Sequence, residues 1–152
     1  MMKRMDRLKI REMTTEDIDA VHEIENASFS VPWSRAIFEE TFANDDNEFW
    51  VAEAEGRIAG YINLWYVLDE VTVANIAVAG EFRRQGVAAA LMEHAFKLSE
   101  ERRMYGVTLE VRVSNIPAIK LYERFGFESA GIRPDYYEKP REDAVIMWKY
   151  FH

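Results

Sequence analysis

The stretch Arg83-Arg84-Gln85-Gly86-Val87-Ala88 decides the fold, because it joins an expected strand over residues 71–78 to an expected helix over residues 86–103. Apolar residues recur at helical spacing from Val87 to Leu98 and predict that helix. The first turn of a helix has free backbone N–H groups and a positive dipole end, and both attract phosphate. Gly86 lets a ligand approach the backbone closely, and the two arginines add positive charge.

The spacing of this stretch alone leaves two interpretations open. No Gly-Lys-Ser/Thr follows, so the stretch is not a Walker loop, and the three glycines of a dinucleotide-binding turn are missing. It is therefore either an anion-binding turn of another kind or an ordinary basic loop with one glycine at the start of a helix.

The rest of the chain reads as alternating strands and helices. Thr14 and Ser34 are expected to cap two helices, Asn115 caps a later one, and Gly126 fits the end of that later helix. Glu55-Gly56 indicates a hairpin. The expected order is β-α-α-β-β-β-α-β-α-β-β, a mixed α/β domain, with strands over residues 8–11, 49–54, 58–67, 71–78, 107–113, 127–132 and 144–150.

Composition indicates one globular domain and argues against nucleic-acid binding. The chain has 152 residues, 49% of them hydrophobic, which is enough to build a core. Its formal net charge of −8 argues against a surface for nucleic-acid phosphates. The charge suits a cationic partner such as an amine or a basic peptide, and it equally fits an acidic surface that only keeps the protein in solution.

The chain has no cysteine, which excludes disulfides, a thiolate nucleophile and cysteine-based metal sites. His22, His94 and His152 lie far apart and show no metal-ligand spacing, so we expect no metal. The basic start lacks the apolar segment of a signal peptide, and no apolar run approaches the ~20 residues that span a bilayer. We therefore expect a cytoplasmic protein that does not bind a membrane.

The motif Arg83-x-x-Gly86-x-Ala88 resembles the acetyl-CoA pyrophosphate signature of the GNAT acyltransferase superfamily, with Ala88 where a second glycine is commoner. The resemblance extends over nearly the whole chain and is greatest to the RimI-type ribosomal-protein-alanine N-acetyltransferases. The stretches that carry it are Pro32-Trp33-Ser34, Val67-Leu68-Asp69-Glu70, Asn75-Ile76-Ala77-Val78, Leu109-Glu110-Val111-Arg112-Val113-Ser114-Asn115, Ala118-Ile119-Lys120-Leu121-Tyr122-Glu123, Gly126-Phe127, Tyr136-Tyr137 and Arg141-Glu142-Asp143-Ala144.

This resemblance implies one GNAT domain over residues 1–152, with residues 1–6 as a flexible N-terminus. It implies a mixed, mostly antiparallel sheet of about seven strands flanked by about four helices. Acetyl-CoA is the implied co-substrate. The residues expected to hold it are Ala77, Val78, Arg83, Arg84, Gln85, Gly86, Val87, Ala88 and Asn115.

Glu110 and Tyr122 are the expected catalytic pair. Alternation along residues 107–113 places Glu110 on one strand face, where it could equally be an ordinary solvent-facing carboxylate. Tyr122 lies on the helix after Asn115, with Leu121 and Phe125 expected to face the core, and packing alone could explain a tyrosine there. The resemblance implies that Glu110 is the general base, acting through a water, and that Tyr122 is the general acid.

Aromatic residues in loops are expected to hold the acceptor. The resemblance places Trp33, Tyr136 and Tyr137 beside the peptide groove, and Glu25 and Asp135 could attract a positively charged peptide end. Trp65 and Tyr66 are further candidates. Each aromatic residue could instead belong to the core.

The implied reaction is transfer of acetyl to the α-amino group of a protein N-terminus, first of all the N-terminal alanine of a small-subunit ribosomal protein. Alternatives on the same fold are a broader enzyme for serine, threonine or methionine ends, and an acetyltransferase for small amines or lysine. A module that only binds acetyl-CoA is a further alternative, and the presence of both Glu110 and Tyr122 argues against it.

Overall fold

The structure is a computed structural model that describes residues 8–151. The expected flexible segment at residues 1–6 lies outside this range. The described elements confirm the expected order of strands and helices. They are β1 (Lys9–Glu12), η2 (Thr15–Asp17), α1 (Ile18–Ser28), α2 (Arg35–Ala43), β2 (Asn47–Ala54), β3 (Arg57–Val67), β4 (Glu70–Val78), η3 (Gly80–Phe82), α3 (Val87–Glu101), β5 (Gly106–Arg112), α4 (Ile116–Arg124), β6 (Glu128–Tyr137) and β7 (Glu142–Tyr150).

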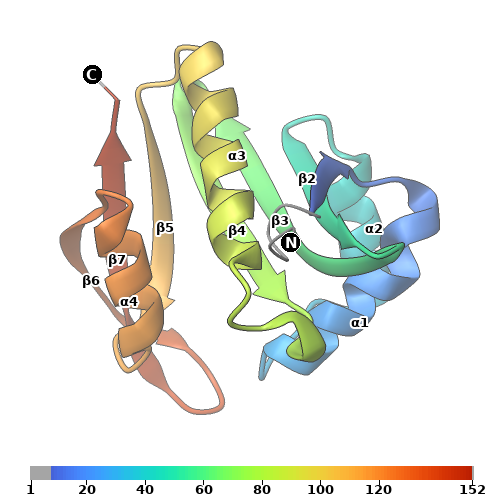
Figure 1. Ribbon diagram of the computed structural model, residues 1–152. Helices are drawn as coiled ribbons and strands as arrows, with labels where there is room; N and C mark the ends of the chain where they lie inside the picture. The colour runs from blue at the N-terminus through green and yellow to red at the C-terminus, as the bar shows by residue number, and fades with distance from the viewer. Residues whose placement is uncertain (1–7, 152) are drawn as a thin grey trace.

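The seven strands form one sheet in the order β1-β2-β3-β4-β5-β7-β6. Neighbouring strands are antiparallel except for β4 and β5, which run parallel. That parallel pairing covers only Glu70–Thr72 of β4 and 106–108 of β5. Beyond these positions the two strands diverge, and Figure 1 shows the separation between them. The sheet is therefore continuous at one end of β4 and open at the other.

Helices cover the two faces of the sheet unequally. α3 and α4 lie on one face, and α1 and α2 pack on the other face against β2, β3 and β4 (Figure 1). The larger core lies beneath α3 and includes Leu64, Leu91 and Leu109. The smaller core, which includes Val21, Phe38 and Tyr61, lies beneath α1 and α2. Among residues 8–151, α1 and α2 pack against β2, β3 and β4, and the helices leave the second face of β5, β7 and β6 largely uncovered.

The expected caps explain where the helices begin. The Ser34 hydroxyl accepts the Ile37 backbone N–H at 3.2 Å, and the Asn115 side chain accepts the Ala118 N–H at 3.3 Å. Each satisfies one of the N–H groups that a helix start leaves without a carbonyl. Gly86 precedes α3 with a φ of 81°, and Gly126 follows α4 with a φ of 95°, so both adopt the left-handed conformation that favours glycine.

A bulge in β4 changes which side chains face α1. Asn63 of β3 pairs with Asn75, whereas Leu64 pairs with Val73, so Ala74 is an extra residue in β4. An extra residue shifts the alternation of side chains between the two faces. Val71 and Val73 therefore face the core beneath α3, while Asn75 faces the opposite side and reaches Glu25 of α1.

Gly60 allows α3 to begin close to the sheet, and Gly60→Ala is expected to destabilise the protein by about 1–3 kcal/mol. A Cβ at this position would lie 2.8 Å from the Ala77 carbonyl oxygen and 3.0 Å from Cγ1 of Val87. Urea unfolding measures the change. Gly80→Ala is the matched control, since a Cβ there meets nothing within 4 Å. Equal stability of the two variants would contradict a close approach of Gly60 in β3 to Val87 of α3 and to the Ala77 carbonyl of β4.

Candidate active site

A groove of about 790 Å³ lies where β4 and β5 diverge. One wall is residues 72–76 of β4, including the bulge, and the other is residues 109–112 of β5. The segment between α1 and α2 and the end of β6 flank it. Among the residues that line it are eight of those expected from the sequence: Glu25, Trp33, Trp65, Glu110, Asn115, Tyr122, Tyr136 and Tyr137.

The groove passes between the two faces of the sheet, and the expected catalytic residues reach it from opposite faces. Leu109 and Val111 belong to the core beneath α3, so Glu110, which alternates with them, faces the other way. Tyr122 comes from α4 and joins the core beneath α3. An acceptor and a donor could therefore enter from opposite faces and meet between the strands.

Tyr122 is the buried residue of α4, and Leu121 beside it is only half-buried. The Tyr122 ring packs edge-on against Phe127, with 5.8 Å between the ring centroids. Burial raises the pKa of the Tyr122 phenol to about 12. The hydroxyl therefore keeps its proton at neutral pH, which is the form that a general acid requires.

Glu110 has two polar partners from β6. The Arg133 Nε donates a hydrogen bond to Glu110 Oε2 at 3.0 Å, and the Arg133 side chain is half-exposed. Burial raises the pKa of Tyr136, and the neighbouring Glu110 carboxylate raises it further. These contacts hold the Glu110 carboxylate at the groove wall, where an amine could reach it.

Arg112 joins the two flanks of the groove. Its guanidinium donates hydrogen bonds to the Glu138 and Pro140 carbonyls, both at 2.9 Å, and to Glu142 Oε1 at 3.1 Å. It also donates to the Ser30 hydroxyl at 3.3 Å. The same guanidinium lies 4.5 Å from the centre of the Tyr137 ring. One side chain thus ties the loop after α1 to the turn between β6 and β7.

Glu25 is a buried carboxylate at the back of the groove, with only 1% of its surface exposed. Its Oε2 accepts the Trp33 backbone N–H at 2.9 Å. Its Oε1 accepts the Asn75 side-chain amide at 2.8 Å and the Tyr61 hydroxyl. Glu25 therefore fixes Trp33 and the β4 bulge relative to each other. Because three donors already occupy it, it serves as a support for the wall.

The expected phosphate-binding turn follows β4 and η3 along the chain and leads into α3. Arg84 and Gly86 both have positive φ, and the side chains of Arg83 and Arg84 are exposed. The first hydrogen bond of α3 runs from Ala90 N to Gly86 O. The backbone N–H groups of residues 87–89 therefore have no carbonyl partner within the helix. Ala77 and Val78 connect this turn to the groove wall, although their side chains do not line it.

The other candidate residues for holding the acceptor lie in different environments. Trp65 lines the groove and is 44% exposed, whereas Tyr66 packs under Arg102, 5.1 Å from its ring centre. Asp135 lies 3.6 Å from Arg141 at the exposed end of β6 and is not among the residues that line the groove, so its attraction for a peptide end stays a prediction. Sequence reasoning missed Arg112, Arg133 and the role of Asn75, since their partners are remote in the chain.

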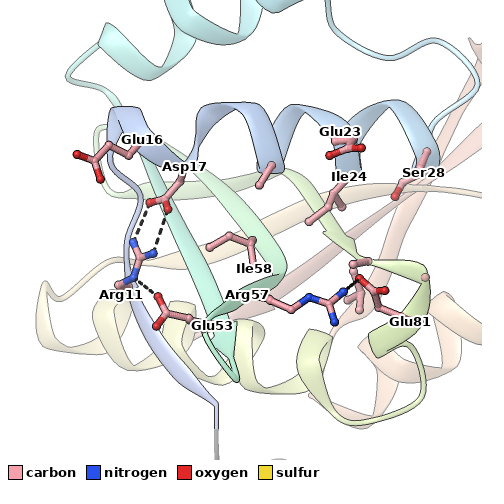
Figure 2. Close-up of a pocket in the computed structure, with 16 residues that line it drawn as sticks. Arg11, Glu16, Asp17, Glu23, Ile24, Ser28, Glu53, Arg57, Ile58 and Glu81 are labelled. Carbon is pink, nitrogen blue, oxygen red and sulfur yellow. Dashed lines mark hydrogen bonds and ion pairs between the residues drawn. The ribbon is translucent and has the colours of Figure 1, made fainter.

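A second cavity, of about 550 Å³, lies between α1 and the hairpin of β2 and β3. Figure 2 shows Arg11 bound to Asp17 and Glu53 at one end, and Arg57 bound to Glu81 at the other. The hydrogen bond from Arg11 lowers the pKa of Asp17 to about 2, so this pair stays charged. Of the expected site residues only Val78 lines this cavity. Both of its arginines are thus occupied by internal partners.

Within residues 8–151, no group of three or more histidine, aspartate and glutamate side chains is arranged to hold a metal ion. None of the helices that these residues form is both long enough and apolar enough to cross a membrane.

Comparisons with known proteins agree with this geometry. The model of the acetyltransferase (GNAT) family matches residues 18–127. A ribosomal protein bS18-alanine N-acetyltransferase of Escherichia coli K12 is 41% identical over 143 residues, covering 91% of this chain and 94% of that protein. The crystal structure of the Escherichia coli ribosomal-protein-S18-alanine N-acetyltransferase matches with a TM-score of 0.89 and 37% identity, over 94% of this chain and 93% of that one.

An archaeal structure shares the fold over a similar length. Ard1 from Thermoplasma volcanium matches with a TM-score of 0.86 and 31% identity, covering 95% of this chain and 97% of that one. The fold and family expected from the sequence are confirmed. The chain belongs to the acetyltransferase (GNAT) family and is an acetyl-CoA-dependent N-acetyltransferase.

Proposed function

We propose that this enzyme acetylates the N-terminal alanine of a ribosomal protein, with bS18 as the first candidate. Similarity over most of the chain to bS18-alanine N-acetyltransferases supports this substrate. A ribosomal protein substrate would place the reaction in the cytoplasm. The observation that carries the proposed chemistry is that Glu110 and Tyr122 line one groove, at the divergence of β4 and β5.

The residues near the start of α3 fit the phosphates of acetyl-CoA. The amides of residues 87–89 begin a helix of 15 residues, and Arg83 and Arg84 carry exposed positive charge beside them. Gln85, Gly86, Val87 and Ala88 supply the backbone of the turn. Ala77 and Val78 would offer backbone groups to the pantetheine amides and to the acetyl oxygen, and Asn115 would lie beside the pantetheine arm. Bound acetyl-CoA supplies an activated acyl group.

Glu110 would take the proton that the amine loses, directly or through a water. An α-amino group with a pKa of about 7.8 is roughly one-seventh neutral at pH 7, so a modest base suffices. The Glu110–Arg133 pair lies at the surface, where such a pair contributes about 0–1 kcal/mol. A protonated peptide end can therefore replace the Arg133 guanidinium at little cost.

Tyr122 would donate its phenolic proton to the sulfur that leaves when the new amide bond forms. Tyr122 lines the groove from the helix-covered side, opposite the face that carries Glu110. Trp33, Tyr136 and Tyr137 would flank the peptide end. The amine thus approaches from the Glu110 side and the thioester from the Tyr122 side.

A panel of short peptides tests the substrate. Purified enzyme is incubated with acetyl-CoA and equimolar peptides that begin with Ala, Ser, Thr, Met or Gly, and with one N-blocked peptide that carries an internal lysine. Mass spectrometry then locates the acetyl group. Acetylation of the alanine end in clear preference to the others is the expected result. Acetyl spread evenly over several ends, or found only on lysine, would contradict the proposal.

The pH dependence follows from the pKa of the amine and that of Tyr122. We expect kcat/KM for an alanine peptide to rise with the neutral amine until about pH 8 and then stay level to about pH 10. The raised pKa of Tyr122, about 12, keeps its hydroxyl protonated across this range. Initial rates at constant ionic strength measure the profile. A fall with a midpoint below pH 10 would show that the acid is not this buried tyrosine.

A further inference from the structure

The uncovered face of the sheet carries a continuous set of exposed apolar side chains. We call it the aromatic face, and its members are Trp65, Val67, Tyr105, Trp148 and Tyr150. All except the half-buried Trp148 are between 41% and 52% exposed. Exposed apolar surface of this extent commonly marks an interaction site.

Strand register places these residues in two rows across the sheet. Trp65 of β3 pairs with Thr72, Thr72 with Thr108, and Thr108 with Trp148. In the next row Val67 pairs with Glu70, Glu70 with Gly106, and Gly106 with Tyr150. Paired residues share a face of the sheet. The two threonines leave a shallow strip between the two tryptophans.

The aromatic rings at the β7 end are held in place. Trp148 and Tyr150 are stacked with 5.3 Å between ring centroids and an interplanar angle of 2°. Tyr105 contacts Tyr150 edge-on at 5.4 Å. A Cβ on Gly106 would lie 3.3 Å from the Tyr150 ring and 3.4 Å from the Trp148 ring, so the glycine makes room for both. The surface is therefore already ordered before a partner arrives.

The aromatic face is continuous with the groove. Trp65 and Thr72 line the groove and also begin the first row. At the wide end of the divergence, Arg112 bridges Ser30 and the Glu138 carbonyl, which joins the two flanks there. A bound substrate peptide whose first residue lies beside Glu110 would therefore continue over Thr72 and Thr108 to the aromatic face.

Acidic side chains lie within this face and next to it. Glu70 lies within the second row, and Glu128 is paired with Trp148 at the outer edge. Asp69 precedes Glu70 in the turn between β3 and β4. With a net charge of −8 over the chain, these carboxylates favour a partner that carries lysine or arginine beside apolar side chains.

We infer that the aromatic face binds the substrate's own chain downstream of the acetylated end. This inference rests on the proposed function and extends it from the terminal residue to the following segment. Glu110 lies two residues from Thr108 along β5, about 7 Å, and three strand steps from β3 to β7 span about 14 Å. An extended chain covers these lengths with about two and about four residues. The segment that binds the aromatic face therefore comprises about residues 4–8 of the substrate, counted from its acetylated end. We expect this segment to contain basic and apolar side chains.

Kinetics with two peptides of different length test this surface. Both begin with the same four residues, and the longer one continues for eight more that include lysine and aromatic side chains. We expect wild-type kcat/KM to be about tenfold higher for the long peptide. The double variant Tyr105→Ser with Tyr150→Ser should lose this preference and keep its kcat/KM for the short peptide. Replacing the lysines of the long peptide by glutamate should also abolish the preference.

Ile37→Ser is the control for loss of an exposed apolar side chain, because Ile37 is 50% exposed on α2, which packs against β2. Thermal unfolding of each variant shows that it remains folded. An unchanged preference in the tyrosine variant would overturn the inference. So would a change in oligomeric mass caused by that variant, which would assign the face to a contact between two copies. Acetylation of the short peptide reports on the proposed function separately.

Discussion

Glu110→Gln is expected to lower kcat for an alanine-starting peptide by about 10²–10⁴-fold. Glutamine keeps the shape of the side chain and can still contact Arg133, but it cannot take a proton from the amine. The affinity for acetyl-CoA should stay within about twofold, since Glu110 faces away from the core beneath α3 and from the turn at residues 83–88. Steady-state rates and calorimetric titration with acetyl-CoA measure the two effects.

Glu138→Gln is the control for this change, because Glu138 also lines the groove but lies at its flank. It removes the same charge from the groove, so it separates the loss of a base from a general loss of negative potential. Similar rates for wild type and Glu110→Gln would remove Glu110 from the chemistry. A similar loss in both variants would mean that the overall charge of the groove matters more than the position of one carboxylate.

Tyr122→Phe is expected to have the second largest effect, a loss of about 10²-fold or more in kcat. Phenylalanine retains the ring that packs against Phe127 and removes only the hydroxyl that would protonate the leaving sulfur. Stability should change little for the same reason, which urea unfolding checks. Because the hydroxyl acts on the leaving group, KM for the peptide should change less than kcat.

Tyr137→Phe is the matched control, since Tyr137 also lines the groove and burial raises its pKa to about 12 as well. Its ring lies against Arg112, so it is placed to shape the groove wall. We expect a small effect on kcat from Tyr137→Phe and a large one from Tyr122→Phe. A larger loss of kcat from Tyr137→Phe than from Tyr122→Phe would assign the role of general acid to Tyr137.

Local patterns explain why much of the fold was predictable from the sequence. Ser34, Asn115 and Gly126 mark helix ends through bonds to residues three or four positions away, and such bonds can be read from spacing alone. Alternation along residues 107–113 placed Glu110 opposite Leu109 and Val111, as the structure shows. The turn at Arg83–Ala88 was visible because strand, glycine and helix follow one another in the chain.

The groove itself was not predictable, because it depends on contacts between distant residues. The parallel pairing of β4 and β5 ends at Thr72 and Thr108, and no local pattern in either strand marks that end. The bulge at Ala74 shows only in the register of β3 against β4. Arg112 meets Ser30 across 82 positions of the chain, and Glu25 meets Asn75 across 50.

The most deeply buried residue of α4 is not one of those that the sequence pattern predicts to face the core. Of the two residues expected to face inward, Phe125 packs against the core, whereas Leu121 is only half-buried and Tyr122 is the most deeply buried residue of the helix. Periodicity over nine residues defines a helix face only to within about one position, and hydrophobicity favoured leucine over tyrosine there. The burial of Tyr122 raises its pKa, so its hydroxyl stays protonated at neutral pH.

The most direct measurement is a crystal structure with a bisubstrate ligand, in which CoA is joined through an acetyl bridge to the α-nitrogen of an alanine-starting peptide. We expect the nitrogen to lie between Glu110 and Tyr122, where β4 and β5 diverge, with the pyrophosphate on the amides of residues 87–89. The peptide should leave over Thr72 and Thr108. A ligand bound in the cavity beside Arg11 and Arg57, or a nitrogen remote from Glu110, would contradict the proposed site.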